Sequence, residues 1–280
     1  MRRSGSDATI ASVRFDGTLI FVAAWLGVSA PAAASAEAPD PICADRPGQG
    51  NSSCTVPAGM IQFETTFVDW TRDQANGERT DALVIGETAI KLGLTSRADI
   101  ELIISPYNRA TVRADGERER AAGFGDVTIR AKYRLTADSS PVQATLLPFV
   151  KIPTAKRALG NGKVEGGIAV PIQWAIPESP LSLTFGPELD LIADGDGHGH
   201  HLAMVQLAGL GVPLSSRLSV SADVLGAWDW DPAGTTKQYT AGASAAWLMS
   251  NDVQLDAGIN LGLNRAASDV QVYGGIALRF

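Results

Sequence analysis

The sequence lacks the features that mark helical membrane proteins and nucleic-acid binders. Aromatic residues make up only 6% of its 280 residues and charged residues 19%, although 45% are hydrophobic. Beyond the N-terminal region, no apolar run reaches the roughly 18 residues that a membrane-spanning helix needs. The formal net charge is −7, so the basic surface that binds phosphate backbones is also missing. These absences argue against both classes, but not against a β-barrel, whose apolar residues alternate along strands.

Histidine and catalytic motifs are equally scarce. All three histidines, His198, His200 and His201, lie in the Gly-rich stretch "DGDGHGHH". No G-x-S-x-G nucleophile motif is present. A membrane lipase would need a serine beside a histidine. The sequence gives little support for pairing Ser219 or Ser221 with a histidine of this stretch. We therefore expect no enzyme and no cofactor.

The same stretch is the candidate for a metal site. Imidazoles and carboxylates suit zinc or nickel, and carboxylates alone suit calcium. The glycines between His198, His200 and His201 provide flexibility and no preformed geometry. A solvated loop is the preferred interpretation, so these three residues are weak metal candidates.

The N-terminus carries an export signal. Three arginines within the first 14 residues precede the apolar run "TLIFVAAWLGVSA", and the small residues "ASA" follow at positions 34–36. A basic region, an apolar region and such a cleavage site predict a cleaved signal peptide over residues 1–36. The alternative is an uncleaved anchor, but the apolar run is too short to span a bilayer comfortably.

The chain has two cysteines, Cys43 and Cys54. An exported protein folds in an oxidising compartment, so we expect them to form a disulfide. A metal site would need nearby histidines or further cysteines, and no small-residue lipobox precedes Cys43; free thiols are the other alternative. The disulfide falls in a predicted periplasmic N-terminal segment over residues 37–59. The sequence leaves open whether residues 37–57 stay in the periplasm or enter the barrel as a plug.

From about residue 60 the chain becomes a series of segments with alternating polarity. Each ends at a cluster of Gly, Pro, Asn, Asp or Ser, which is typical of an all-β barrel or sandwich. In one of them, Leu183 and Leu189 share one face while Thr184 and Glu188 share the other. We predict about twelve antiparallel strands, over residues 60–71, 80–94, 97–112, 122–136, 141–154, 163–176, 180–193, 200–213, 216–230, 236–249, 251–264 and 268–280.

The connections alternate between short and long. The short ones are 95–97, 137–140, 177–180, 213–216 and 249–252, and the long ones are 72–79, 113–121, 155–163, 194–200 and 231–236. In outer-membrane barrels, short turns face the periplasm and long loops face outside. An even strand number then places both termini in the periplasm. The sequence thus predicts a transmembrane antiparallel β-barrel over residues 60–280, surrounded by lipid in the outer membrane of a Gram-negative bacterium.

Aromatic residues support an outward apolar face, because they cluster near both strand ends as interfacial girdles do. Those at the outer ends are Trp70, Trp228, Trp230 and Tyr239, and those at the periplasmic ends are Tyr133, Trp174, Trp247 and Phe280. The inward face is charged. Its candidates are Glu64, Glu101, Arg130, Lys132, Arg134, Lys151, Glu165, Glu188, Asp190, Asp223 and Asp256.

Among these lumen candidates, Arg130, Lys132 and Arg134 form a basic ladder on one strand and are the strongest candidates for contacts with a solute or a plug. Two interpretations of the charged lumen stay open. The charges either select solutes along a polar path or pair across a narrow lumen and close it.

The chain ends on the alternating stretch "VYGGIALRF". As the closing strand it would pair with the first strand, because an open edge cannot sit in lipid. The residues expected toward lipid are Val272, Ile276, Leu278 and Phe280, and those toward the lumen are Tyr273, Gly275, Ala277 and Arg279. Tyr273, Gly275, Leu278 and Phe280 resemble the terminal signal read by the barrel assembly machinery, which makes that machinery an expected partner.

Three stretches carry a family resemblance: "ICADRPGQGNSSCTVPAGMIQFETTF" near the start, "GFGDVTIRAKYRL" over 123–135 and "LLPFVKIPTA" over 146–155. Together they resemble the outer-membrane "transporter" family named for the meta-pathway of phenol degradation, over about residues 42–280. The resemblance implies an outer-membrane barrel that helps hydrophobic aromatic compounds or similar small molecules to cross. It carries no defined catalytic or ligand residues, so none is transferred.

Two functions from different classes follow. The first is passive passage of small molecules, hydrophobic or aromatic ones included, through a porin-like barrel. The second is a structural or surface-interaction barrel with a closed lumen, whose outer loops bind partners. An outer-membrane enzyme fits least well.

Overall fold

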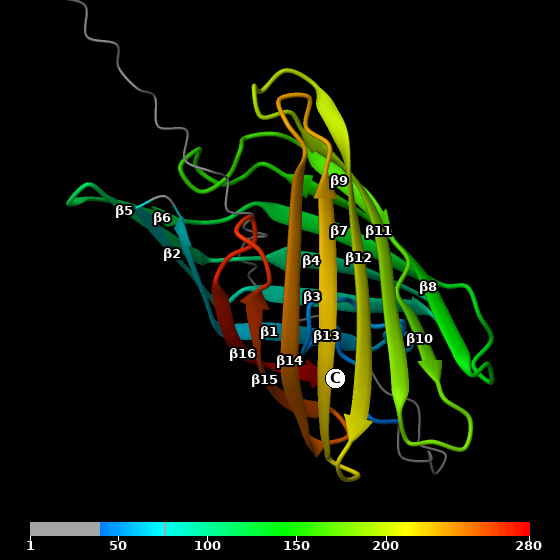
Figure 1. Ribbon diagram of the computed structural model, residues 1–280. Coiled ribbons are helices and arrows are strands. Elements are labelled where there is room, and N and C mark those ends of the chain that lie inside the picture. The colour runs from blue at the N-terminus through cyan, green and yellow to red at the C-terminus, as the bar shows by residue number, and fades with distance from the viewer. Residues whose placement is uncertain (1–39, 76) are drawn as a thin grey trace, which may run out of the picture.

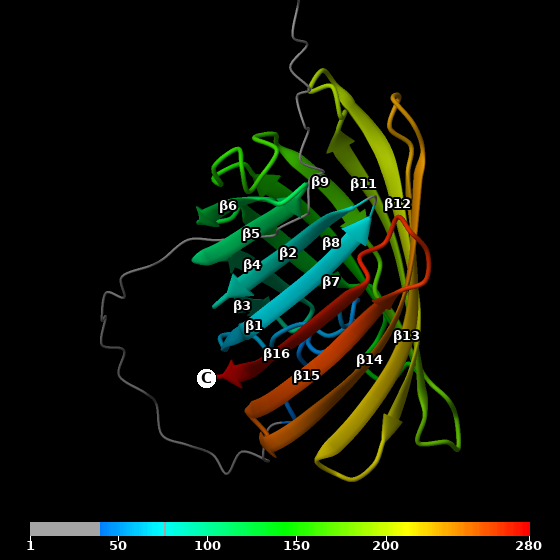
Figure 2. The same cartoon turned by 60° about the vertical axis from the view of Figure 1, so that its left-hand side comes forward.

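Alternating polarity along each strand determines the architecture, because one face of every strand points inward and the other meets an apolar surrounding. The computed structural model describes residues 40–280 except residue 76, so the predicted signal peptide lies outside the described residues. The described chain forms a closed antiparallel barrel (Figures 1 and 2). No helix in this part of the chain is long and apolar enough to cross a membrane.

The wall of the described chain consists of 16 strand segments, and all segments that are neighbours in the sheet pair antiparallel. They are β1 (Ile61–Ala75), β2 (Glu78–Ile85), β3 (Thr88–Thr95), β4 (Ala98–Ile104), β5 (Tyr107–Ala114), β6 (Glu117–Gly123), β7 (Val127–Arg134), β8 (Val142–Ile152), β9 (Glu165–Ala169), β10 (Ile172–Ala175), β11 (Ser182–Ala193), β12 (His200–Pro213), β13 (Leu218–Asp229), β14 (Thr236–Ser250), β15 (Val253–Gly262) and β16 (Val270–Arg279).

These 16 segments make up 12 barrel strands, because four strands are interrupted. β2 continues into β3, β4 into β5, β6 into β7 and β9 into β10. The interruptions fall at Gly86, Pro106, Gly125 and Pro171. Proline cannot donate a ladder hydrogen bond, and glycine tolerates a positive φ such as the 75° of Gly86. The prediction of twelve antiparallel strands is confirmed.

Two of the predicted long loops are wrong. Residues 72–79 and 113–121 are largely strand, because β1 and β2 extend to Ala75 and from Glu78, and β5 and β6 to Ala114 and from Glu117. Asp115 and Gly116 have φ angles of 51° and 82°, which suits a two-residue hairpin turn. The charges on these strand tips hid the polar–apolar alternation on which the strand prediction depended.

The barrel closes between its first and last strands. β1 pairs with β16 from Gln62↔Arg279 to Arg72↔Val270. The ring of Phe280 lies edge-on to that of Phe63, with centroids 6.1 Å apart. The predicted closing strand and its inward and outward faces are therefore confirmed.

The two faces of the wall differ as expected for a membrane barrel. Outward side chains such as Leu94, Leu191 and Val224 are 54%, 51% and 53% exposed. Inward side chains such as Lys91 and Glu101 are only 2% and 1% exposed. A soluble barrel would bury its apolar residues instead, so this surface fits a hydrocarbon surrounding.

β1, β2, β5 and β6 form a ribbon that projects from the barrel, and we call it the outer ribbon (Figure 1). Its inner face packs Ala82 and Ala110 against Leu159 from the connection between β8 and β9. The outer face of the ribbon is therefore the opposite one.

Candidate functional site

The lumen is occupied by the chain's own N-terminal segment. Residues 42–57, which we call the plug, lie inside the barrel (Figure 2). The plug begins where Ile42 N donates to Asn251 O (2.6 Å), and it is followed by Gly59, whose N donates to Gly93 O (2.9 Å). Of the two arrangements that the sequence leaves open for residues 37–57, the described part of the segment takes the plug arrangement. The polar lumen draws in a segment that has no apolar face of its own.

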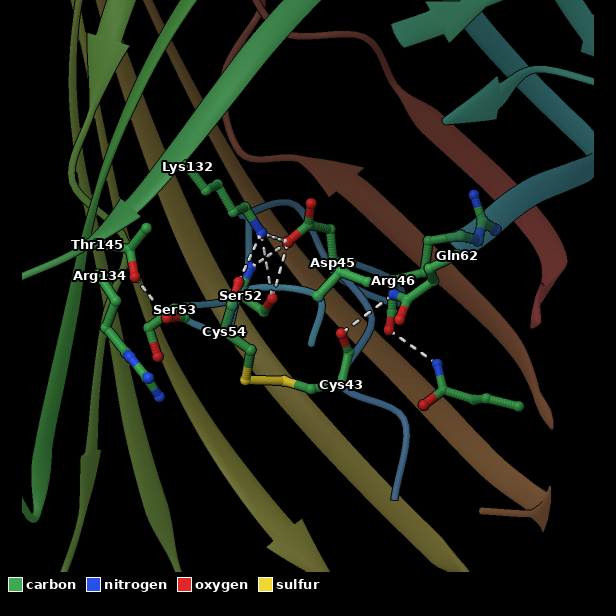
Figure 3. The surroundings of a disulfide bond; sticks show 12 residues. Cys43, Asp45, Arg46, Ser52, Ser53, Cys54, Gln62, Lys132, Arg134 and Thr145 are labelled. Carbon is green, nitrogen blue, oxygen red and sulfur yellow. Dashed lines mark hydrogen bonds and ion pairs between the residues drawn. A yellow bond between two sulfur atoms is a disulfide. The ribbon is translucent and has the colours of Figure 1, made fainter. Parts of the chain in front are cut away.

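A disulfide ties the two arms of the plug together. Cys43 and Cys54 are bonded, as predicted, and are 11 positions apart in sequence. The barrel wall binds both cysteine carbonyls: Gln62 Nε2 donates to Cys43 O (3.2 Å) and Lys132 Nζ to Cys54 O (3.3 Å) (Figure 3). Closing a loop of this length stabilises the folded arrangement by about 3 kcal/mol in the chain-entropy model.

The plug is held mainly by a buried group of charges that we call the lysine–carboxylate cluster. It consists of Asp45 from the plug and Glu64, Lys91, Glu101 and Lys132 from β1, β3, β4 and β7. Asp45 lies 2.5 Å from both Lys91 Nζ and Lys132 Nζ. Lys91 Nζ is also 2.5 Å from Glu64 and 3.5 Å from Glu101. Three carboxylates thus face two ammonium groups.

Asp45 is the plug's contribution to this cluster, and it is firmly ionised. Burial by itself would raise the pKa of Asp45, but the positive charges of Lys132 and Lys91 outweigh burial and lower that pKa below its usual range. Because the folded-state pKa is lowered, the stabilisation is present at neutral pH and is lost only as the pH falls into strong acid.

A second attachment joins the plug to the opposite wall. Arg46 binds Asp256 on β15 with two guanidinium nitrogens, Nη2 at 2.8 Å and Nε at 3.2 Å from Oδ1. Its Nη1 donates to Thr66 Oγ1 at 2.5 Å. The Asp256 side chain is fully buried, so its charge depends on Arg46 for compensation.

The tip of the plug contacts further strands. Gly48 N donates to the Tyr273 hydroxyl (3.0 Å), and Gln49 Nε2 donates to Asp223 (2.5 Å). Arg130 donates to Asn51 Oδ1 at 2.9 Å. Gly48 has a φ of 116°, a conformation that favours glycine and allows the chain to turn here.

The structure divides the predicted lumen candidates into two groups. Those at the plug or in its charge cluster are Glu64, Glu101, Arg130, Lys132, Asp223 and Asp256. Those elsewhere on the inner wall are Arg134, Lys151, Glu165, Glu188 and Asp190. Of the basic ladder, Arg130 and Lys132 contact the plug, whereas Arg134 binds Asp138 and the carbonyl of Ser96 at the short turns.

Sequence reasoning missed Lys91 on the wall and the plug residues Asp45, Arg46 and Gln49. Lys91 alternates correctly within its strand, between the outward Ile90 and Leu92. That inward position was a usable signal. The roles of Asp45, Arg46 and Gln49 had no such signal, because the plug has no periodicity.

A cavity lies beside the plug. Its volume is about 490 Å³, and it separates residues 42–53 from the wall formed by β10 to β15. Small hydroxyl and glycine residues line this wall, among them Ser182, Thr184, Gly209, Gly211, Ser221 and Ser244. Pro180 and Pro213 place one end at the short turns, and the other end reaches Leu207, which meets Gly50 of the plug tip.

The histidine-rich stretch is organised by carboxylates. His201 Nδ1 lies 2.8 Å from Asp194 and its Nε2 lies 2.7 Å from Asp229, so both ring nitrogens have partners. His200 Nε2 lies 2.8 Å from Val164 O. Among residues 40–280 without residue 76, no group of three or more His, Cys, Asp or Glu side chains is arranged to hold a metal ion. Ser221, a candidate serine for pairing with these histidines, shares a hydrogen bond with Ser244 instead.

Comparison with known proteins gives one family. The sequence model described as "Putative MetA-pathway of phenol degradation" matches residues 44–280. No curated protein sequence matches the chain.

Several solved barrels have a similar course of the chain at low identity. The translocator domain of the autotransporter NalP from Neisseria meningitidis is 16% identical, with 80% of this chain and 90% of that chain covered and a TM-score of 0.44. The CymD monoaromatic hydrocarbon channel is 10% identical, with 80% and 88% covered and a TM-score of 0.42. Outer membrane phospholipase A from Escherichia coli is 10% identical, with 80% and 91% covered and a TM-score of 0.39.

Proposed function

The chain belongs to the family named for the meta-pathway of phenol degradation, and from this premise we propose that it is an outer-membrane barrel for the passive passage of small molecules. The solutes are small and uncharged, hydrophobic and aromatic ones included. The short turns face the periplasm and the outer ribbon faces outside, in keeping with the alternation of turn lengths.

The observation that carries this proposal is the cavity beside the plug. Its wall presents hydroxyl groups and glycines, which make room for a solute and offer weak hydrogen bonds. Weak binding suits passage, because a solute must leave as readily as it enters. Near the plug tip, Asp223 adds a negative charge to the cavity lining, and this charge disfavours anions.

Passage requires the plug tip to move. The plug is anchored by ion pairs at Asp45 and Arg46. Its tip meets the wall through the packing of Gly50 on Leu207 and through the hydrogen bonds that Gly48 N donates to Tyr273 and Gln49 Nε2 donates to Asp223. Displacing residues 48–50 would break these tip contacts and join the cavity to the outer half of the lumen, while both ion pairs stay in place. A hydrogen bond contributes about 0.5–3 kcal/mol, whereas breaking a buried ion pair costs about 3–5 kcal/mol.

The test is solute flux into proteoliposomes that contain the purified barrel. Phenol-sized neutral solutes should enter faster than their carboxylate analogues. Ser221→Phe should reduce this flux because its ring would fill the cavity. The matched control is Val224→Phe on the same strand, where the side chain is 53% exposed on the outward face, and it should leave the flux unchanged.

The same plug also supports a second candidate, a structural or surface-interaction barrel with a closed lumen. Ion pairs to several strands are what a permanently closed lumen would have. No flux above protein-free vesicles, with either solute class, would contradict passage and favour this second function.

A further inference from the structure

The outer ribbon carries a concentration of arginine on its outward face, which we call the arginine face. Its members are Arg72 on β1, Arg79 on β2, Arg109 and Arg113 on β5, and Arg118 and Arg120 on β6. Cross-strand pairing arranges them in rows. One row runs Arg79↔Arg113↔Arg118, and the next runs Arg72↔Asp81↔Thr111↔Arg120.

The register shows that these side chains share one face. Ala82 and Ala110 are paired, and both pack against Leu159 on the inner face. Side chains alternate between faces along a strand, so Arg79 and Arg113, at odd spacing from these alanines, point outward. Glu117 and Glu119 of β6 alternate to the other side and do not neutralise the row.

The charge on this face is unbalanced. Asp81 is the one acid in these paired rows among the described residues, and it contacts Arg72 and Arg79 at 3.1 and 3.0 Å and also Arg113. Arg113 and Arg118 stand directly opposite each other across two strands. Like charges in that position destabilise a sheet, unless an anion lies over them.

The position of the face points to lipid. Arg72 lies over the ring of Trp70, with its guanidinium carbon 4.6 Å from the ring centroid. Trp70 pairs with Leu83 on β2. Ile85, two residues further along β2 on the same face, is 42% exposed. Interfacial tryptophan marks the boundary between hydrocarbon and headgroups, so the arginines begin at headgroup level.

We propose that the arginine face binds the phosphate groups of the phosphorylated glycolipid in the outer leaflet. Guanidinium groups match phosphate oxygens with paired hydrogen bonds. The rows lie about 7 Å apart along the strands and neighbours about 5 Å apart across them, so several phosphates fit at once. The proposal rests on the orientation given under the proposed function, with the outer ribbon outside.

The test compares two triple variants of the full barrel in detergent. Arg79→Gln/Arg113→Gln/Arg118→Gln removes one row and keeps Arg72 beside Asp81, so the sheet should still fold. Arg97→Gln/Arg217→Gln/Arg265→Gln removes the same charge from exposed positions elsewhere. Affinity is measured for lipid A, dephosphorylated lipid A, phosphatidylglycerol and inorganic phosphate.

Lipid A should bind the first variant at least about tenfold more weakly than it binds the wild type, and the second variant as it binds the wild type. Dephosphorylated lipid A should bind weakly to all three proteins. Equal affinity of the two variants for lipid A would overturn the proposal. So would equal affinity of the wild type for phosphatidylglycerol, or displacement of lipid A by equimolar inorganic phosphate. Solute flux is measured on the same three proteins after reconstitution into proteoliposomes, so loss of flux with intact lipid binding would count against the passage function alone.

Discussion

Replacing Asp45 by asparagine should raise the single-channel conductance of the reconstituted barrel by about tenfold or more. Asp45 is the plug residue that binds both Lys91 and Lys132, at 2.5 Å each. The asparagine loses the charge-assisted part of both contacts, and a hydrogen bond to a charged group contributes about 1.5–3 kcal/mol. Each 1.4 kcal/mol changes a population by about tenfold, so the displaced plug becomes far more frequent.

The barrel itself should tolerate this change, because the cluster then balances two carboxylates, Glu64 and Glu101, against two lysines. The matched control is Asp138→Asn, whose partner is Arg134 and whose side chain is 74% exposed. An exposed pair contributes little, so the conductance of that control should equal the wild-type value. Unchanged conductance for Asp45→Asn would show that Asp45 does not hold the plug.

Replacing Lys91 by methionine should lower the stability of the barrel itself, which Asp45→Asn should leave largely unchanged. Lys91 is 2% exposed and serves Asp45, Glu64 and Glu101. Its loss leaves three buried carboxylates with Lys132 alone, which costs about 3–5 kcal/mol. The unfolding temperature should fall by on the order of 10 °C, measured by circular dichroism or by heat-dependent migration in gels.

A double variant separates charge balance from simple damage. Lys91→Met/Asp45→Asn leaves two carboxylates and one lysine, which restores the net charge of the wild-type cluster. It should regain part of the lost unfolding temperature, because contacting charges are not additive. A double variant less stable than Lys91→Met would contradict the assignment of the cluster.

The wall of the barrel could be predicted because its signal is local. Alternation such as that of Leu183 and Thr184 repeats every second residue, and it located the strands, their number and the lipid-facing side. The disulfide was predictable from two neighbouring cysteines together with the predicted export signal. The outer ribbon escaped prediction because arginines occupy outward positions near its strand tips, where apolar residues stand on other strands.

The plug could not be predicted from local patterns. Arg46 and Asp256 are 210 positions apart, and Gln49 and Asp223 are 174 apart. The sequence around one partner does not indicate the other, because a polar residue in a lumen can contact solvent, a solute or a plug equally well. Only the closed barrel brings them together, so the choice between an open and an occupied lumen needed the structure.

We infer from the contacts of the plug that residues 42–57 close the lumen. The most direct test is the conductance in planar bilayers of a barrel that lacks these residues, before and after addition of a disulfide-cyclised peptide covering residues 40–58. We expect a large, steady conductance that the peptide blocks and that its Asp45→Asn form blocks poorly. A deleted barrel that inserts normally yet conducts no more than the wild type would contradict this inference.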